Sequence, residues 1–111
     1  EAERRLAEHP LEAARLWRLV GWARLERGAA AGAERAFRTA WALAPHEDAE
    51  MGVGLSLLAQ GLRGEAWVHL RRVARTNPEL LELVPDPELR AAINQSFEDA
   101  ARSRRPGRPR Q

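Results

Sequence analysis

The chain contains four segments in which apolar residues recur every three to four positions, the spacing of an α-helix. These segments are residues 11–27, 30–44, 47–60 and 64–76. Pro10 suits the first turn of the first segment, and Pro45 ends the second. Gly28 and Gly61 follow the first and third segments at the position that favours a left-handed backbone. The pattern therefore predicts two helical hairpins joined by short turns.

Each predicted helix is apolar on more than one side, which indicates packing between two neighbours. In the first helix these residues are Leu16, Trp17, Leu19, Val20, Trp22, Ala23 and Leu25. Small residues at regular places predict close contacts between helices, where a larger side chain would cost about 1–3 kcal/mol by overpacking. They are Gly21, Ala33, Ala40, Gly54 and Ala66. Gly52 has no such explanation in the pattern.

One helical hairpin is repeated by the next. The first carries Trp17-x2-Val20-Gly21, then Ala33-x3-Phe37 and Pro45, and the second carries Val53-Gly54-x2-Leu57, then Ala66-x3-Leu70 and Pro78. The copies lie 33 residues apart, as from Pro45 to Pro78. The pattern resembles the bacterial-type tetratricopeptide (TPR) repeat, W-x2-L-G-x2-Y, A-x3-F and P in a helix-turn-helix unit of about 34 residues. The resemblance implies an all-α fold, a right-handed α-solenoid of antiparallel helix pairs with a capping helix.

This resemblance divides the chain into five parts. They are residues 1–10, a remnant of the second helix of an earlier repeat; 11–46, the first repeat; 47–78, the second repeat; 79–102, the broken first helix of a third repeat followed by a capping helix; and 103–111, a disordered basic tail. Asp86 is expected to be the N-cap of the capping helix, with Pro87 at its first position. Two repeats fall short of the roughly three that stabilise such an array. Missing repeats, a second copy of the chain or the C-terminal segment would then cover the open faces.

In TPR proteins the first helices of the repeats line a groove for a protein or peptide partner. Carried over by register, the groove positions are Arg15, Arg18, Trp22, Leu25, Met51, Leu55 and Leu58. The resemblance implies a scaffold that binds a helix or an extended peptide, with Trp22, Met51 and Leu55 as anchors and the arginines as orienting groups. In the alternative, residues 87–102 fold into the groove and these positions are core. A self-associating end of a longer TPR protein is a further hypothesis.

Charge separates the body of the chain from its tail. All 18 basic residues are Arg; residues 1–100 hold 13 of them against 16 acidic residues, and residues 101–111 hold five and no acid. The tail partly resembles the Gly-Arg-Pro core of an AT-hook, which binds the DNA minor groove. An alternative function is therefore a nucleic-acid-associated module, and a solubilising tail without a partner is the simpler interpretation. The tail arginines are Arg102, Arg104, Arg105, Arg108 and Arg110.

The sequence offers little chemistry for catalysis. There is no cysteine, and His9, His46 and His69 lack the spacing of metal ligands, so all three are expected at the surface or in loops. We therefore expect no enzyme, no metal and no cofactor. Arg71, Arg72 and Arg75 are interpreted as a solvated outer face. No apolar stretch is long enough to span a membrane, and a cytoplasmic location is expected.

Overall fold

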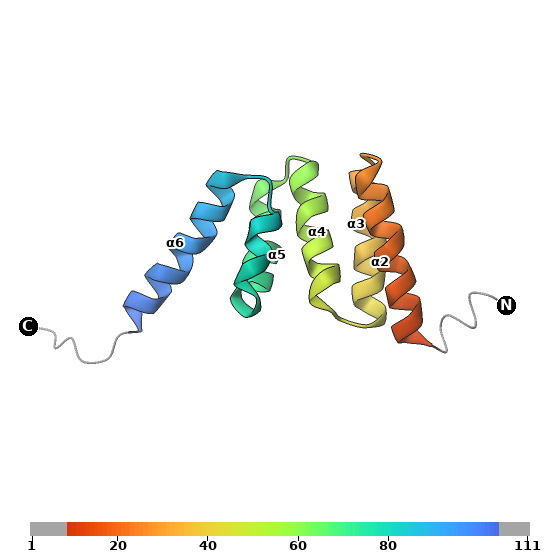
Figure 1. Ribbon diagram of the computed structural model, residues 1–111, viewed down its shortest axis with the longest axis horizontal. Coiled ribbons are helices and arrows are strands. Elements are labelled where there is room, and N and C mark those ends of the chain that lie inside the picture. Colours follow the sequence, from red (N-terminus) through yellow and green to blue (C-terminus); the bar gives the residue numbers. More distant parts are fainter. Residues whose placement is uncertain (1–8, 105–111) are drawn as a thin grey trace, which may run out of the picture.

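The computed structural model describes residues 9–104, and that part of the chain is all-α with no strand. It contains five α-helices and one 3-10 helix (Figure 1). Their bounds are Pro10–Glu26 (α2), Ala30–Leu43 (α3), Glu47–Ala59 (α4), Arg63–Thr76 (α5), Pro78–Leu83 (η1) and Pro87–Ser103 (α6). The four helices expected from the apolar spacing are confirmed within one residue at each end. The expected remnant at residues 1–8 and most of the basic tail, residues 105–111, lie outside the described part.

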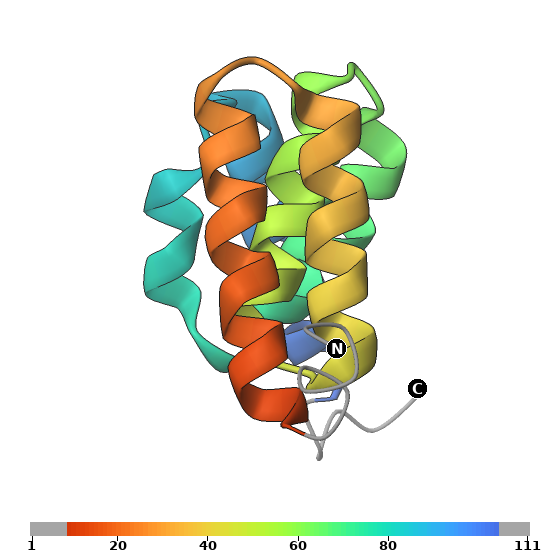
Figure 2. The same cartoon turned by 90° about the vertical axis from the view of Figure 1, so that its right-hand side faces the viewer.

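Consecutive helices pack side by side along the chain: α2 against α3, α3 against α4, and α4 against α5. Short connections reverse the chain direction between them (Figure 1). Seen from the α2 end, η1 lies on the side of α2 and away from α3 (Figure 2). The helix after it, α6, packs against α5. The result is a row of helices with α4 in the middle.

The helix ends follow the local signals in the sequence. Gly28 and Gly61 both have φ of +80°, the left-handed conformation that closes a helix without a Cβ penalty. The Asp86 side chain accepts a hydrogen bond from the Leu89 backbone N–H at 3.0 Å, which confirms it as the N-cap of α6. Where the repeat pattern expects the first helix of a third repeat, residues 78–83 form a 3-10 helix that ends before Pro85.

The phenyl ring of Phe37 forms the centre of the first helix contacts. It is fully buried and meets the Trp22 ring edge-on at 4.8 Å between centroids. A Cβ built on Gly21 of α2 would lie 2.8 Å from this ring, and one on Gly52 of α4 would lie 2.4 Å from it. Both helices therefore approach α3 through a glycine. This contact explains Gly52, for which the repeat pattern has no reason.

Gly52→Ala tests this contact. The added Cβ overlaps the buried ring of Phe37, so we expect a loss of about 1–3 kcal/mol in the free energy of unfolding, measured by urea denaturation. Gly64→Ala is the matched control, because its Cβ meets nothing within 4 Å and no loss of stability is expected from it. Equal stability changes in the two variants would show that Phe37 does not limit the approach of α4.

Candidate functional site

An apolar groove of about 600 Å³ lies between α2, α4 and η1. Its apolar lining includes Leu25, Leu55, Leu58, Leu83 and Pro85. The first three are residues that the repeat register placed in a groove. The last two come from the segment after the second repeat, where the register made no assignment. The signal in the sequence that could have indicated them is the apolar segment between Pro78 and Pro87.

An ion-pair cluster holds one rim of the groove in place. Arg63, at the start of α5, donates to both carboxylate oxygens of Asp86 at 2.9 and 3.2 Å and lies 3.6 Å from Glu88. The Leu89 N–H and the Arg63 guanidinium together lower the pKa of Asp86 below its ordinary value. Because Arg63 and Asp86 both line the groove, this cluster ties the start of α6 to α5 beside it.

Two of the expected binding residues are engaged within the protein. The Trp22 indole N–H donates to Asp48 at 3.0 Å, and the Arg18 Nε lies 3.5 Å from the same carboxylate oxygen. Asp48 therefore joins α2 to α4 by neutralising Arg18. Trp22 is half-buried against Phe37. Arg15 is exposed, and none of Arg15, Arg18 and Trp22 lines the groove.

Met51 is 2% exposed and belongs to the main core, so the expectation that it anchors a partner is wrong. Its counterpart in the first repeat, 33 residues earlier, is Arg18, which stays half-buried. The two positions differ because α4 has neighbours on both sides, whereas α2 lies at the end of the row (Figure 1). The repeat register assigns equivalent positions but does not include how many neighbouring helices each repeat has.

The C-terminal helix does not fill the groove. Its apolar residues Leu89 and Ile93 are buried, and α6 packs against α5. The guanidinium of Arg71 lies 4.7 Å above the Phe97 ring and its Nε donates to Ser96 at 2.8 Å. The groove residues Leu55 and Leu58 consequently remain partly exposed. The interpretation of Arg71 as part of a solvated face is wrong, because this arginine joins α5 to α6.

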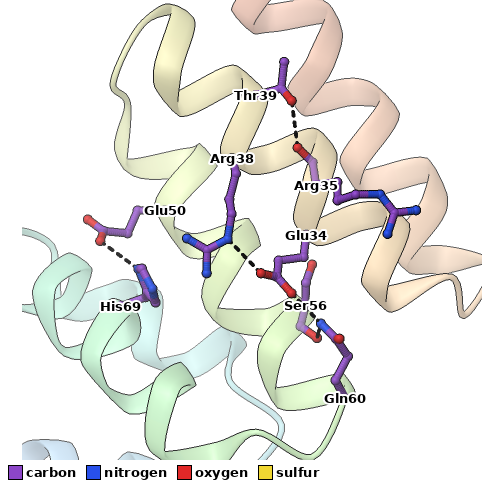
Figure 3. A network of polar contacts seen from close by, with 8 residues as sticks. All are labelled: Glu34, Arg35, Arg38, Thr39, Glu50, Ser56, Gln60 and His69. Atoms are coloured by element: carbon purple, nitrogen blue, oxygen red, sulfur yellow. Dashed lines mark hydrogen bonds and ion pairs between the residues drawn. The ribbon is translucent and has the colours of Figure 1, made fainter.

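A second polar cluster lies over α4 between α3 and α5 (Figure 3). Glu50 is 6% exposed, and its Oε2 accepts from Arg72 at 2.7 Å and lies 3.1 Å from His69 Nδ1. The expectation that His69 is a surface or loop histidine is therefore wrong, since it lies within α5 and is partly buried. Arg72 is exposed, as expected for an outer face, and also pairs with Glu50. A buried carboxylate needs such partners. Glu50 directly precedes the largely apolar segment Met51–Leu58. This position alone does not predict that Glu50 is buried, because its partners lie on another helix.

Beside this cluster, Glu34 connects α3 to α4. It accepts from Arg38 at 2.7 Å and from Gln60 at 2.8 Å (Figure 3). These two hydrogen bonds, Gln60 first, lower the pKa of Glu34 below its ordinary value of 4.5. The ionised form of Glu34 is thus the one that holds the two helices together.

The tail arginines are only partly within the described residues. Arg102 pairs with Asp99 at 2.7 Å, and Arg104 is exposed at the end of α6. Arg105, Arg108 and Arg110 lie outside the described part of the chain. The nucleic-acid hypothesis therefore stays a prediction.

Comparisons of the chain with protein-family models, with curated proteins and with solved structures found no match. Between residues 9 and 104, no three His, Asp or Glu side chains gather where they could hold a metal ion. None of the helices in that range is long and apolar enough to cross a membrane.

Glu34→Gln tests the link between α3 and α4. Since the pKa of Glu34 is lower in the folded state than in the unfolded state, its contribution to stability is complete above pH 4.5 and is lost as the pH falls through the lowered folded value. We expect urea midpoints of the variant to fall less steeply than those of the wild type below pH 4.5. Glu98→Gln, at an exposed α6 residue without a side-chain hydrogen bond among residues 9–104, is the control and should keep the wild-type slope. Parallel curves for Glu34→Gln and wild type would contradict the assignment.

Proposed function

We propose that the protein is a TPR-like interaction module that holds an apolar segment of a partner protein in the groove between α2, α4 and η1. The observation that carries this proposal is the groove itself, an apolar hollow of about 600 Å³ that α6 leaves open. Its volume lies within the range of about 300–1,000 Å³ typical of binding pockets. The proposal includes no catalytic step and no cofactor.

The helix contacts support the TPR-like part of the proposal. Gly21 receives Phe37, and 33 residues later Gly54 receives Leu70, with a built Cβ at 2.8 and 2.6 Å from the facing side chain. The two hairpins thus use the same pair of positions for close approach. A repeated contact of this kind is what a right-handed solenoid of antiparallel helix pairs requires.

The groove favours a partner segment with one or two apolar anchors. Leu55 and Leu58 form part of the wall and are half-buried, whereas Leu83 projects at the rim and is 60% exposed. Covering an exposed leucine side chain contributes about 1.5–3 kcal/mol. Arg63, Asp86 and Glu88 supply charge at one rim, where polar groups of a partner would set its direction.

Selection of a phage-displayed peptide library on the protein tests the groove. We expect the enriched peptides to carry apolar anchors and to lose about tenfold in affinity on Leu83→Ser, measured by calorimetry with the selected peptide. Leu11→Ser is the matched control, because Leu11 is 76% exposed, on α2, and outside the groove. Peptides that bind both variants equally, or that bind only Leu83→Ser more tightly, would refute the groove as the binding site.

Self-association is a second candidate, favoured by one specific observation. Leu16, Leu19 and Val20 form an exposed stripe on α2. The positions 33 residues later, Ala49, Gly52 and Val53, are buried in α4. In the second repeat, the preceding helix α3 packs against α4 and covers these positions. Among residues 9–104, no helix precedes α2 to cover the corresponding stripe.

A second copy of the chain would cover this stripe. We expect sedimentation velocity to show a concentration-dependent dimer that Leu16→Glu abolishes, since a charge in an apolar interface costs several kcal/mol. Val68→Glu, on an exposed α5 position, is the control. A monomer at every concentration would refute self-association and leave the groove proposal unaffected.

A further inference from the structure

A second cavity, of about 240 Å³, lies between α3 and α5 with α4 as its floor. Its lining consists of Arg38, Trp41, Glu50, Val53, His69 and Arg72. None of these residues lines the apolar groove. We name this cavity the arginine cleft.

The arginine cleft is rich in hydrogen-bond donors and poor in acceptors. Arg38 uses its Nε on Glu34, and Arg72 uses one Nη on Glu50. Within residues 9–104 the other guanidinium N–H groups and the Trp41 indole N–H make no hydrogen bond, and each guanidinium carries five N–H donors. The only carboxylate in the lining is Glu50, whose Oε2 already serves Arg72 and His69. A ligand that satisfies this cleft must supply acceptors.

Charge alone does not make the cleft attractive to an anion, because Glu34 and Glu50 offset the charges of Arg38 and Arg72. The N–H groups that these two pairs leave free are what favour an anion. Glu50 is nearly buried, so it holds Arg72 and His69 from beneath and leaves the outer N–H groups to the cleft. Planar guanidinium groups match the oxygens of carboxylates and phosphates, often with two hydrogen bonds each.

The walls of the cleft indicate what the anion is attached to. Trp41 is 38% exposed and lies one turn after Arg38 on α3, and Val53 forms part of the lining. The exposed part of the indole offers an apolar surface against which a ring can pack. A bare inorganic ion would leave this surface unused.

The geometry points to a binding site in the arginine cleft for an oxyanion, a carboxylate or a phosphate, carried on an aromatic group. The oxygens lie between the guanidinium groups of Arg38 and Arg72, and the ring packs on Trp41. This site is separate from the groove proposed for a partner segment, and it depends on none of the groove's residues.

Titration of ¹⁵N-labelled protein, followed by the four tryptophan indole N–H signals, tests the site. The probes are phenyl phosphate, benzoate and the uncharged benzyl alcohol, and Trp41→Phe assigns the Trp41 signal. We expect phenyl phosphate or benzoate to shift the Trp41 signal with a saturable dissociation constant of about 1 mM, a free energy near −4 kcal/mol, and benzyl alcohol to have no effect. Binding of one anion and not the other identifies the oxyanion and supports the site.

Arg38→Gln should weaken binding about tenfold, the loss expected for a charge-assisted hydrogen bond. Arg35→Gln is the matched control: it removes the same charge from α3, and Arg35 points away from Glu50 and His69 (Figure 3). Unshifted signals of the other three tryptophans verify that each variant is folded. Equal losses in the two variants would show unspecific attraction to positive charge and overturn the proposal. A shift without saturation, or one confined to another tryptophan, would overturn it as well.

Discussion

The fold depends on a single aromatic ring placed between two glycines. Phe37 projects from α3 into the space that Gly21 leaves on α2 and Gly52 leaves on α4, so one side chain sets the approach of both helices. Interiors are packed as tightly as crystals, and a side chain enclosed in this way leaves little freedom for sliding. Leu70 and Gly54 repeat half of this arrangement in the next hairpin. The spacing of the row of helices follows from these contacts.

Fixing α4 between neighbours decides which repeat positions reach the surface. Met51 is enclosed, while its counterpart Arg18 lies near solvent and is neutralised by Asp48. Further along the same helices, η1 is short and does not cover Leu55 and Leu58 completely, so an apolar hollow remains there. The proposed binding surface therefore lies toward the C-terminal ends of α2 and α4, at the junction with η1.

Polar residues join the helices where apolar packing stops. Glu50 binds Arg72 and His69 across α4 and α5, and Arg71 joins α5 to α6 through Ser96 and the Phe97 ring. Of these groups only the Glu50 carboxylate is buried, so removing Arg72 and His69 would leave it without a charged partner, at a cost to stability. The pair of Glu50 and Arg72 also holds a guanidinium group in place at the arginine cleft. Structural ion pairs and the proposed anion site thus share one set of residues.

The sequence by itself determined the local structure. Helix bounds, the left-handed caps at Gly28 and Gly61 and the N-cap at Asp86 depend on residues within one turn of each other, which is why spacing and residue type suffice to predict them. The burial of Met51, the reason for Gly52 and the partners of Glu50 were decided only by the tertiary structure. Each involves helices packed against one another, and the residues that meet there, such as Glu50 and Arg72, are 22 positions apart. Burial and pairing at that range depend on how the whole row of helices packs, and no local pattern contains that information.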